Sequence, residues 1–322
     1  MKLDYFIWLQ KCDSLENTAM PWALAGGFAD HASKCFLEAE VKRLGAESAS
    51  DKETSKQAER EKNQLRQEYI NKNKVFQKFP EDLNTFLDIN FSFLSFFSWL
   101  AFQVDFELLT PWYSKDDRVF HLLDNPVRKD RVFGVPFMAA SSWKGMLRWA
   151  CRMQAGLREH LEQRNGKLDD WQDPDWILHL FGNEKGEGEE FSRGALVFYP
   201  TWFNRIGFEV INPHSRERRA GTQPIYYEVV PPGTKGTLSL LYAPWPGMKP
   251  AANRAEALPK LLEAIETLLT TYGISAKRTV GWGTAKIEKW CTFHKTRGTV
   301  EKNTRDELLQ EVQKWLTPGG TP

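Results

Sequence analysis

Residues Gly134 to Cys151 read Gly-Val-Pro-Phe-Met-Ala-Ala-Ser-Ser-Trp-Lys-Gly-Met-Leu-Arg-Trp-Ala-Cys, and this stretch carries the clearest structural signal in the chain. Ser141 and Ser142 are good helix N-caps, and apolar residues recur after them at helical spacing. Lys144 and Arg148 lie one turn apart on another face. The stretch therefore predicts a loop that leads into the first turn of a helix, with two cations beside it.

This helix start has two interpretations. The first N–H groups of a helix lack intrahelical partners and carry partial positive charge, so they attract anions, and the two cations add full charges. That combination favours binding of the phosphate backbone of a nucleic acid. The alternative is an ordinary amphipathic helix with a solvated basic face.

The composition of the chain limits how it can bind a polyanion. Its 322 residues include 43 Lys and Arg against 42 Asp and Glu, for a formal net charge of +1. A nucleic-acid contact must therefore come from local basic patches and not from the charge of the whole chain. The 13 Trp, 21 Phe and 8 Tyr fit a large core and also surfaces on which unpaired bases stack.

Cysteine usage and hydropathy narrow the class further. The four cysteines lie far apart and form no C-x-x-C pair, which disfavours a zinc site or a disulfide framework. The N-terminus has no signal-peptide pattern, and the apolar run Phe91–Phe102 is too short to span a bilayer, which takes about 20 residues. We expect a soluble cytoplasmic protein with no membrane partner and no organic cofactor.

The pattern along the chain predicts three parts. Residues 1–100 form a helical N-terminal extension, whose charge-rich segment 36–78 predicts a solvated helix or helical hairpin with i,i+4 ion pairs. Residues 101–296 form the core. Residues 297–322 form a C-terminal helix, near 305–316, and a disordered tail.

The core has the element order of a ferredoxin-like, or RNA-recognition-motif-like, α+β fold with insertions. In the strand at 101–109, apolar Phe102, Val104 and Phe106 alternate with polar residues. The helix of the opening stretch runs to about residue 164, a short helix ends at Phe181, and another helix covers 253–271. Further strands are expected at 194–199, 225–230, 236–242 and 284–290.

Three other segments are candidate sites. The first is a basic glycine loop, which contains Lys277, Arg278 and the turn Gly281-Trp282-Gly283. Its glycines either let the backbone approach a ligand closely or form an ordinary turn before an edge strand. Asp124, next to Asn-Pro, either caps a turn or presents a carboxylate to a phosphodiester. The arginine-rich run 204–221 is either a solvated hairpin or a finger on a nucleic-acid strand.

Several common motifs are absent from the sequence. It contains no Walker loop, no dinucleotide-binding fingerprint and no G-x-S-x-G elbow. The six histidines have no partner at metal-ligand spacing. These absences exclude the nucleotide-binding and hydrolase classes that depend on such motifs.

Five stretches in order resemble the RAMP superfamily, the RNA-binding subunits of CRISPR effector complexes. Asp124-Asn-Pro-Val-Arg-Lys-Asp130 is similar to the family's Asp-x-Pro-Val-x-x-Asp loop, and residues 134–148 are similar to its signature ending in Ser-Ser-x-Lys-Gly-x-x-Arg. Arg193-Gly-Ala-Leu-Val-Phe198, Tyr227-Glu-Val-Val-Pro-Pro-Gly-Thr234 and the glycine loop at 277–283 resemble its remaining motifs.

The resemblance implies a ferredoxin-like subunit of a type III effector complex that binds CRISPR RNA and target RNA and contacts other RAMP subunits. Base pairing then reads the target while the protein holds the backbone. The resemblance implies RNA contacts at the start of the signature helix and at the glycine loop. These residues are Ser141, Ser142, Trp143, Lys144, Arg148, Lys277, Arg278, Gly281, Trp282 and Gly283.

The resemblance also implies chemistry at Asp124, because the family's target-cleaving subunits carry an Asp in this loop. Asp124 would cut target RNA with Mg²⁺ or another divalent cation by assisting attack of the adjacent 2′-hydroxyl.

The chain departs from the family pattern in two places. Met138-Ala-Ala replaces the usual Ile-Pro-Gly before the serines, and the helical extension resembles that of the capping subunit, which usually lacks the catalytic Asp. A non-catalytic capping or structural subunit is therefore the alternative. A precursor-RNA endoribonuclease is a further alternative, although His121 and His214 do not match its motif.

Overall fold

The computed structural model describes residues 31–49, 51–73, 89–91, 94–116, 123–130, 135–183, 192–212 and 224–316. The chain forms two compact units. Unit 1 comprises residues 1–84, 111–137 and 202–234, and unit 2 comprises residues 85–110, 138–201 and 235–322. The predicted disordered tail at 317–322 lies outside the described residues.

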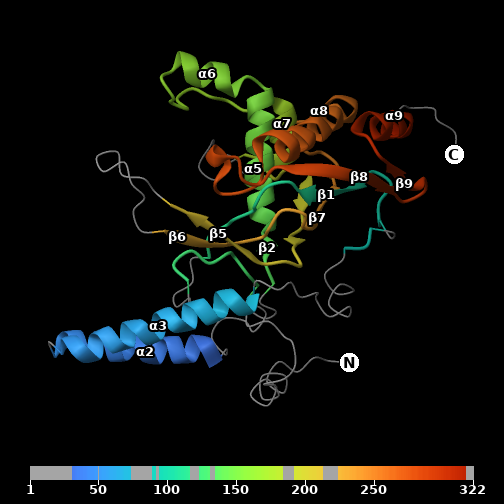
Figure 1. Ribbon diagram of the computed structural model, residues 1–322. Helices are drawn as coiled ribbons and strands as arrows, with labels where there is room; N and C mark the ends of the chain where they lie inside the picture. Colours follow the sequence, from blue (N-terminus) through green and yellow to red (C-terminus); the bar gives the residue numbers. More distant parts are fainter. Residues whose placement is uncertain are drawn as a thin grey trace. The chain divides into compact units, whose positions relative to one another are not determined.

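Unit 2 contains a five-stranded antiparallel sheet in the order β3-β7-β1-β8-β9 (Figure 1). Without β9, the chain order β1-α5-β3-β7-α8-β8 and the sheet order are those of the ferredoxin-like fold, which confirms the predicted fold class. The strands are β1 (Leu100–Leu108), β3 (Leu196–Phe198), β7 (Lys235–Tyr242), β8 (Ala285–His294) and β9 (Gly298–Lys302).

The central strand β1 shows why the alternating pattern was informative. Phe102, Val104 and Phe106 are fully buried, whereas the polar residues between them are partly exposed. β1 pairs antiparallel with β7 on one side and with β8 on the other, and the β8 register shifts between Asp105 and Phe106. A strand paired on both sides and buried on one face fixes the register of the whole sheet.

The signature helix packs on this sheet. α5 (Ala140–Gln154) buries Trp143 and Leu147, and the Trp143 ring meets Phe106 of β1 edge to face with centroids 6.2 Å apart. The helix predicted to reach residue 164 is in fact two helices. Gly156 adopts a φ of 97°, which ends the first, and α6 (Leu157–Gln163) follows.

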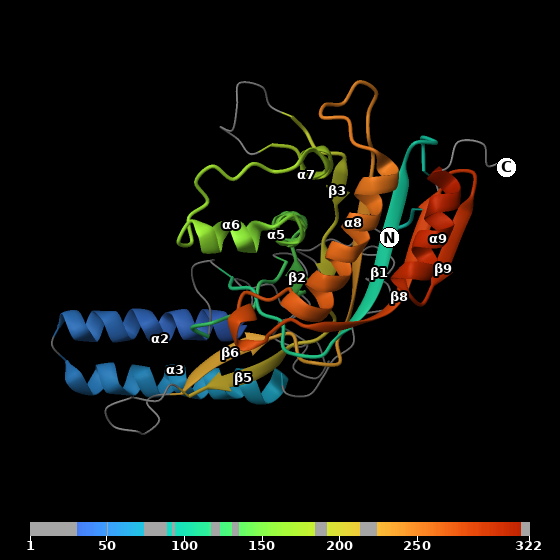
Figure 2. The same cartoon turned by 90° about the horizontal axis from the view of Figure 1, so that it is seen from above.

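Among the described residues, three further helices belong to unit 2, and two of them contact α5 (Figure 2). α8 (Arg254–Thr267) continues as a π-helical turn (Leu268–Tyr272), and α9 (Arg305–Leu316) begins and ends as predicted. α7 (Asp175–Phe181) contacts α5 and α8, and its end at Phe181 was also predicted. The opposite side of the sheet carries a smaller cluster around Phe91, Leu94 and Leu241.

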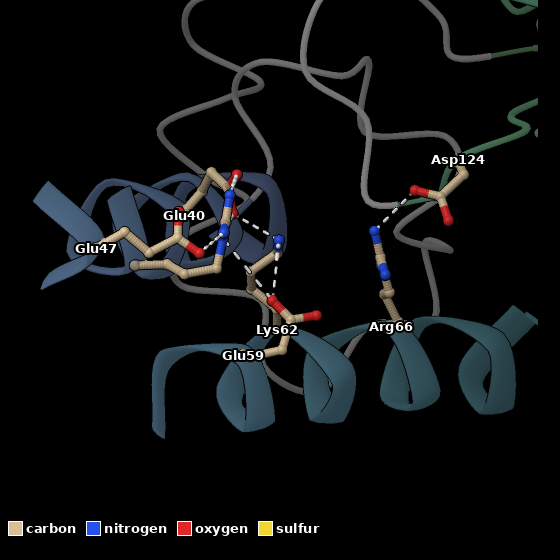
Figure 3. Close-up of polar contacts among 7 residues, drawn as sticks. Glu40, Glu47, Glu59, Lys62, Arg66 and Asp124 are labelled. Atoms are coloured by element: carbon tan, nitrogen blue, oxygen red, sulfur yellow. Dashed lines mark hydrogen bonds and ion pairs between the residues drawn. The ribbon is translucent and has the colours of Figure 1, made fainter. Parts of the chain in front are cut away.

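Unit 1 contains the helical hairpin expected from the charge-rich segment. α2 (His31–Ser48) and α3 (Lys52–Asn73) lie side by side (Figure 2). Arg43 and Lys62 share the carboxylates of Glu40 and Glu59 between the two helices. Figure 3 shows Lys62 between Glu40 and Glu59. The Glu40 pKa falls to about 2 because the Arg43 and Lys62 side chains hydrogen-bond its charged form.

Unit 1 also contains a small two-stranded sheet. β5 (Gly207–Ile211) lies in the run 204–221 and pairs antiparallel with β6 (Ile225–Val229), which matches the strand expected at 225–230. Elsewhere β2 (Phe137–Met138) pairs with β4 (Thr201–Trp202). Among the described helices, none combines the length and apolar content that crossing a bilayer requires.

Candidate nucleic-acid interface

The Asp124 loop is held by backbone pairing in unit 1. The Arg128 N–H donates to the Ser114 carbonyl at 2.7 Å, and the Asp116 N–H donates to the Pro126 carbonyl at 3.1 Å. The Glu228 N–H of β6 donates to the Asn125 carbonyl at 3.0 Å. The loop is therefore tied on two sides, although it contains no regular element of its own.

A buried carboxylate, that of Glu228, also holds this loop in place. Glu228 is 1% exposed and accepts hydrogen bonds from the Val127 N–H at 3.0 Å, from the Lys129 ammonium at 2.6 Å and from the Tyr69 hydroxyl. A buried carboxylate is costly unless donors surround it, and here one backbone donor and two side-chain donors do so. Glu228 thus joins the Asp124 loop to β6 and to helix α3.

Asp124 itself lies at the surface. Its side chain is 78% exposed, and its Oδ1 accepts a hydrogen bond from Nη2 of Arg66 at 2.9 Å (Figure 3). Arg66 comes from α3, so the helical extension contributes a cation directly to the predicted catalytic position. The sequence interpretation assigned α3 only solvent-facing ion pairs and did not anticipate this contact.

The divalent cation implied by the resemblance finds no ready ligand set at Asp124. Among the described residues no group of three or more His, Cys, Asp or Glu side chains is placed to hold a metal ion. The one carboxylate presented at the predicted position already faces the Arg66 guanidinium. The described residues therefore do not provide a resident metal site at Asp124.

The start of the signature helix differs in detail from the prediction. The N-cap is Ala139, without a side-chain hydrogen bond, and the helix begins at Ala140. Ser141 and Ser142 lie in the first turn and are not N-caps, because the helix already begins at Ala140. Ser141 is exposed and Ser142 is partly exposed.

Trp143 and Lys144, which follow the two serines, point in different directions. Trp143 is fully buried, and its indole N–H donates to the Thr201 hydroxyl at 2.9 Å. It is therefore a core residue of α5 and offers no stacking face. Lys144 is exposed, and partial burial together with the charge of Arg148 lowers its pKa. Lys144 is the cation that this helix turn presents to solvent.

Arg148 has a different environment from the one expected for a phosphate contact. It is 8% exposed, and its guanidinium donates to Asp173 Oδ2 at 2.6 Å through Nη2. Arg152 donates to the same carboxylate, and Trp171 adds its indole N–H at 2.9 Å. The structure thus gives Arg148 of α5 a structural partner, Asp173 in the segment before α7, that the sequence analysis missed.

The glycine loop has the backbone conformation that its glycines predicted. Gly281 and Gly283 have φ values of 84° and 88°, which side-chain-bearing residues rarely adopt. A Cβ on Gly283 would lie 2.4 Å from the Ser275 backbone N, so this position also requires a close approach of two chain segments. Lys277 and Trp282 are partly exposed.

Arg278 connects the glycine loop to the signature helix. Its guanidinium carbon lies 4.4 Å from the centroid of the Trp149 ring, a cation–π contact to α5. Burial lowers the pKa of Arg278, and its Nη1 is buried without a hydrogen-bond partner among the described residues. The structure therefore brings two of the predicted sites, α5 and the glycine loop, together within unit 2.

Other predicted positions belong to unit 1 or lie outside the described residues. Asp124 belongs to unit 1, whereas α5 and the glycine loop belong to unit 2. His121 and His214 lie outside the described residues, as does the second half of the arginine-rich run, 213–221. Two site residues that sequence reasoning missed, Arg66 and Glu228, carried only weak signals. Arg66 lies among many charges, and Glu228 is an acid within an otherwise apolar strand.

Comparisons with known proteins agree with this fold. A model of the RAMP superfamily matches residues 105–286, which is more than half of the chain. The comparison with curated proteins gives no match.

Two solved structures are similar in backbone. One is a chain in the cryo-EM structure of the Type III-B Cmr-beta bound to cognate target RNA, at 16% identity, with a TM-score of 0.52 over 75% of this chain and 78% of that one. The other belongs to the crystal structure of the Csm3-Csm4 subcomplex in the type III-A CRISPR-Cas interference complex, at 18% identity and a TM-score of 0.40, covering 69% and 98%. The family match and the ferredoxin-like core together lead to one conclusion: this chain belongs to the RAMP superfamily.

Proposed function

We propose that this chain is an RNA-binding subunit of a type III CRISPR effector complex. The observation that carries the proposal is the juxtaposition of α5 and the glycine loop through Trp149 and Arg278, within a chain of the RAMP superfamily. A helix start, an exposed Lys144 and a glycine loop with close backbone approach are groups that suit an RNA backbone.

The similar Cmr-beta chain is described as bound to cognate target RNA, which supports RNA as the ligand class. Guide RNA, target RNA and neighbouring RAMP subunits are accordingly the proposed partners. A gel shift with the purified chain and a single-stranded RNA tests the proposal. A chain that binds no RNA, alone or in the assembled complex, would contradict it.

We further propose that Asp124 takes part in cutting target RNA. An exposed carboxylate on an anchored loop is suited to accept the proton of a ribose 2′-hydroxyl. The O2′–P bond then forms as the P–O5′ bond breaks, and the leaving O5′ takes a proton from water. The products are a 2′,3′-cyclic phosphate and a 5′-hydroxyl.

Reconstituted complexes containing wild-type chain or the Asp124→Asn variant test this step, each assayed in Mg²⁺ and in EDTA. We expect one or more cuts to fall by about 100-fold or more with the variant, since general base catalysis contributes about 10²–10⁴. The guide should remain bound. An unchanged cutting pattern would contradict the role of Asp124, and the EDTA arm reports whether the reaction needs a divalent cation.

A non-catalytic capping or structural subunit is the second candidate, and one observation favours it. The Arg66 guanidinium donates a hydrogen bond to Oδ1 of the Asp124 carboxylate, so this oxygen is already engaged by a side chain of the protein. In that case the Asp124→Asn complex keeps every cut, and RNA affinity remains the function of the chain.

A further inference from the structure

The Asp124–Arg66 pair joins two distant parts of the sequence. Fifty-eight positions separate the residues, yet Nη2 of Arg66 lies 2.9 Å from Oδ1 of Asp124. The Asp124 side chain is 78% exposed and that of Arg66 is 24% exposed, so the carboxylate faces solvent and the arginine is partly exposed beside it. Figure 3 shows the two side chains pointing toward one another. The pair presents one positive and one negative group at the same point of the surface of unit 1.

Packing fixes the helix that carries Arg66. Tyr69 and Ile70, within one turn of Arg66, form a buried cluster with Leu123, which immediately precedes Asp124. Phe208 of β5 packs on the same cluster, with its ring centroid 6.1 Å from that of Tyr69. The backbones on both sides of the pair are therefore held by one apolar contact.

Polar contacts fix the loop in the same way. The Tyr69 hydroxyl donates to the buried Glu228, which also receives the Val127 N–H of the Asp124 loop. A typical exposed ion pair holds two flexible side chains and contributes about 0–1 kcal/mol to stability. This pair differs because its two elements are already held together, which lowers the entropy cost of keeping both groups in place.

The position of Arg66 also bears on the absence of a metal ligand set. A guanidinium at hydrogen-bond distance repels a divalent cation at the same carboxylate, and the described residues supply no cluster to offset that repulsion. A phosphodiester is attracted by the same guanidinium. Its five N–H donors lie in a planar fork that can hold a carboxylate and a phosphate together.

We propose that Arg66 and Asp124 form an RNA-phosphate site in which the Arg66 guanidinium binds a phosphodiester and holds the Asp124 carboxylate beside it, in place of a resident divalent cation. The inference rests on the proposed function only in taking RNA as the ligand. It does not depend on whether the RNA is cut.

The test uses the full-length chain and a short fluorescent single-stranded RNA, with affinity measured by anisotropy over a series of salt concentrations. Arg66→Gln removes the charge, and Arg66→Lys keeps the charge but removes the fork. Arg60→Gln is the matched control, because Arg60 is an exposed arginine on the same helix, six residues away. Circular dichroism confirms that each variant is folded.

We expect Arg66→Gln to weaken RNA binding about fivefold to tenfold and Arg66→Lys to weaken it less. The slope of log affinity against log salt should become shallower by about 0.7, as expected when one phosphate contact to a single strand is lost. Arg60→Gln should stay within about twofold of wild type. A purely structural role of Arg66 would not change the salt slope.

Mn²⁺ added to the RNA-free chain, followed by electron paramagnetic resonance, gives a second readout. We expect wild type and Asp124→Asn to give the same Mn²⁺ signal. A bound Mn²⁺ that disappears in Asp124→Asn overturns the inference. An Arg66→Gln chain that binds RNA as tightly as wild type also overturns the inference. That outcome leaves the proposed RNA-binding function intact. A wild-type chain that binds no RNA overturns both.

Discussion

At the scale of single residues, the most consequential group is a buried one that never reaches a ligand. Glu228 gathers the Val127 N–H, the Lys129 ammonium and the Tyr69 hydroxyl around one carboxylate. Glu228 does not contact a ligand but holds the loop that carries Asp124, through Val127 and Lys129 of that loop. We therefore regard Glu228 as a positioning residue, distinct from the exposed Asp124.

Replacing Glu228 with Gln should destabilise unit 1, because the Lys129 charge, which is 12% exposed, loses its partner. We expect a loss of about 2–3 kcal/mol, below the roughly 3–5 kcal/mol of fully buried pairs. Urea denaturation measures this change. Glu209→Gln, the same charge loss on the paired strand β5, is the control and should change stability by less than about 0.5 kcal/mol. Equal effects of the two variants would contradict the anchoring role.

Asp173 gives a prediction that depends on pH. Burial raises the pKa of Asp173, but hydrogen bonds from Arg152, Trp171 and Arg148 outweigh burial and hold the pKa below its ordinary value. A lowered folded-state pKa contributes stability above the unfolded-state pKa of about 3.9, and that contribution is lost as pH falls through the folded-state pKa.

Asp173→Asn should therefore cost about 3 kcal/mol at pH 7, since two partly buried arginines lose their counter-ion. The difference from wild type should shrink as pH falls below about 4. Unfolding curves at pH 7, 5 and 3 measure it. A difference that stays constant down to pH 3 would show that the Asp173 charge does not carry the effect.

At the scale of elements, the glycine loop before β8 separates two roles of glycine. Gly281 and Gly283 both have positive φ, but only Gly283 has the Ser275 backbone N within 2.4 Å of where a Cβ would lie. A Cβ on Gly281 would meet nothing within 4 Å. Backbone conformation alone therefore constrains Gly281, whereas Gly283 is also constrained by packing.

Gly281→Ala should cost about 1–2 kcal/mol from left-handed strain alone. Gly283→Ala should cost about 3 kcal/mol or more, because overpacking adds to the same strain. The two variants control for each other in one thermal-unfolding experiment. Equal losses would show that the close approach of Gly283 to Ser275 does not constrain the loop.

At the same scale, the sequence predicted elements well where apolar periodicity was strong. The alternation in β1 and the bounds of α9 are confirmed. β9 was missed because its five residues are polar or exposed, as suits an edge strand, and show no buried face. The break at Gly156 was missed because helical periodicity continues on both sides of it.

At the scale of the whole molecule, the sequence motifs predicted the correct family. They did not predict the role of each residue within the motifs. Trp143 and Arg148 belong to the signature, yet one is a core residue and the other is held by Asp173. Such roles depend on partners 25 or more positions away, as for Arg148 and Asp173. Local patterns carry no information about those contacts, which also explains why Arg66 was not foreseen.

The central claim is that the chain binds RNA at α5 and the glycine loop, and one affinity measurement tests it most directly. The full-length chain and its Lys144→Gln, Arg278→Gln and Lys167→Gln variants are titrated against the same single-stranded RNA. Lys167 is an exposed lysine of unit 2 outside α5 and the glycine loop, so it serves as the control. We predict that the first two variants lose affinity about threefold to tenfold each and that Lys167→Gln binds as wild type does. Equal affinity across all four chains would contradict the claim.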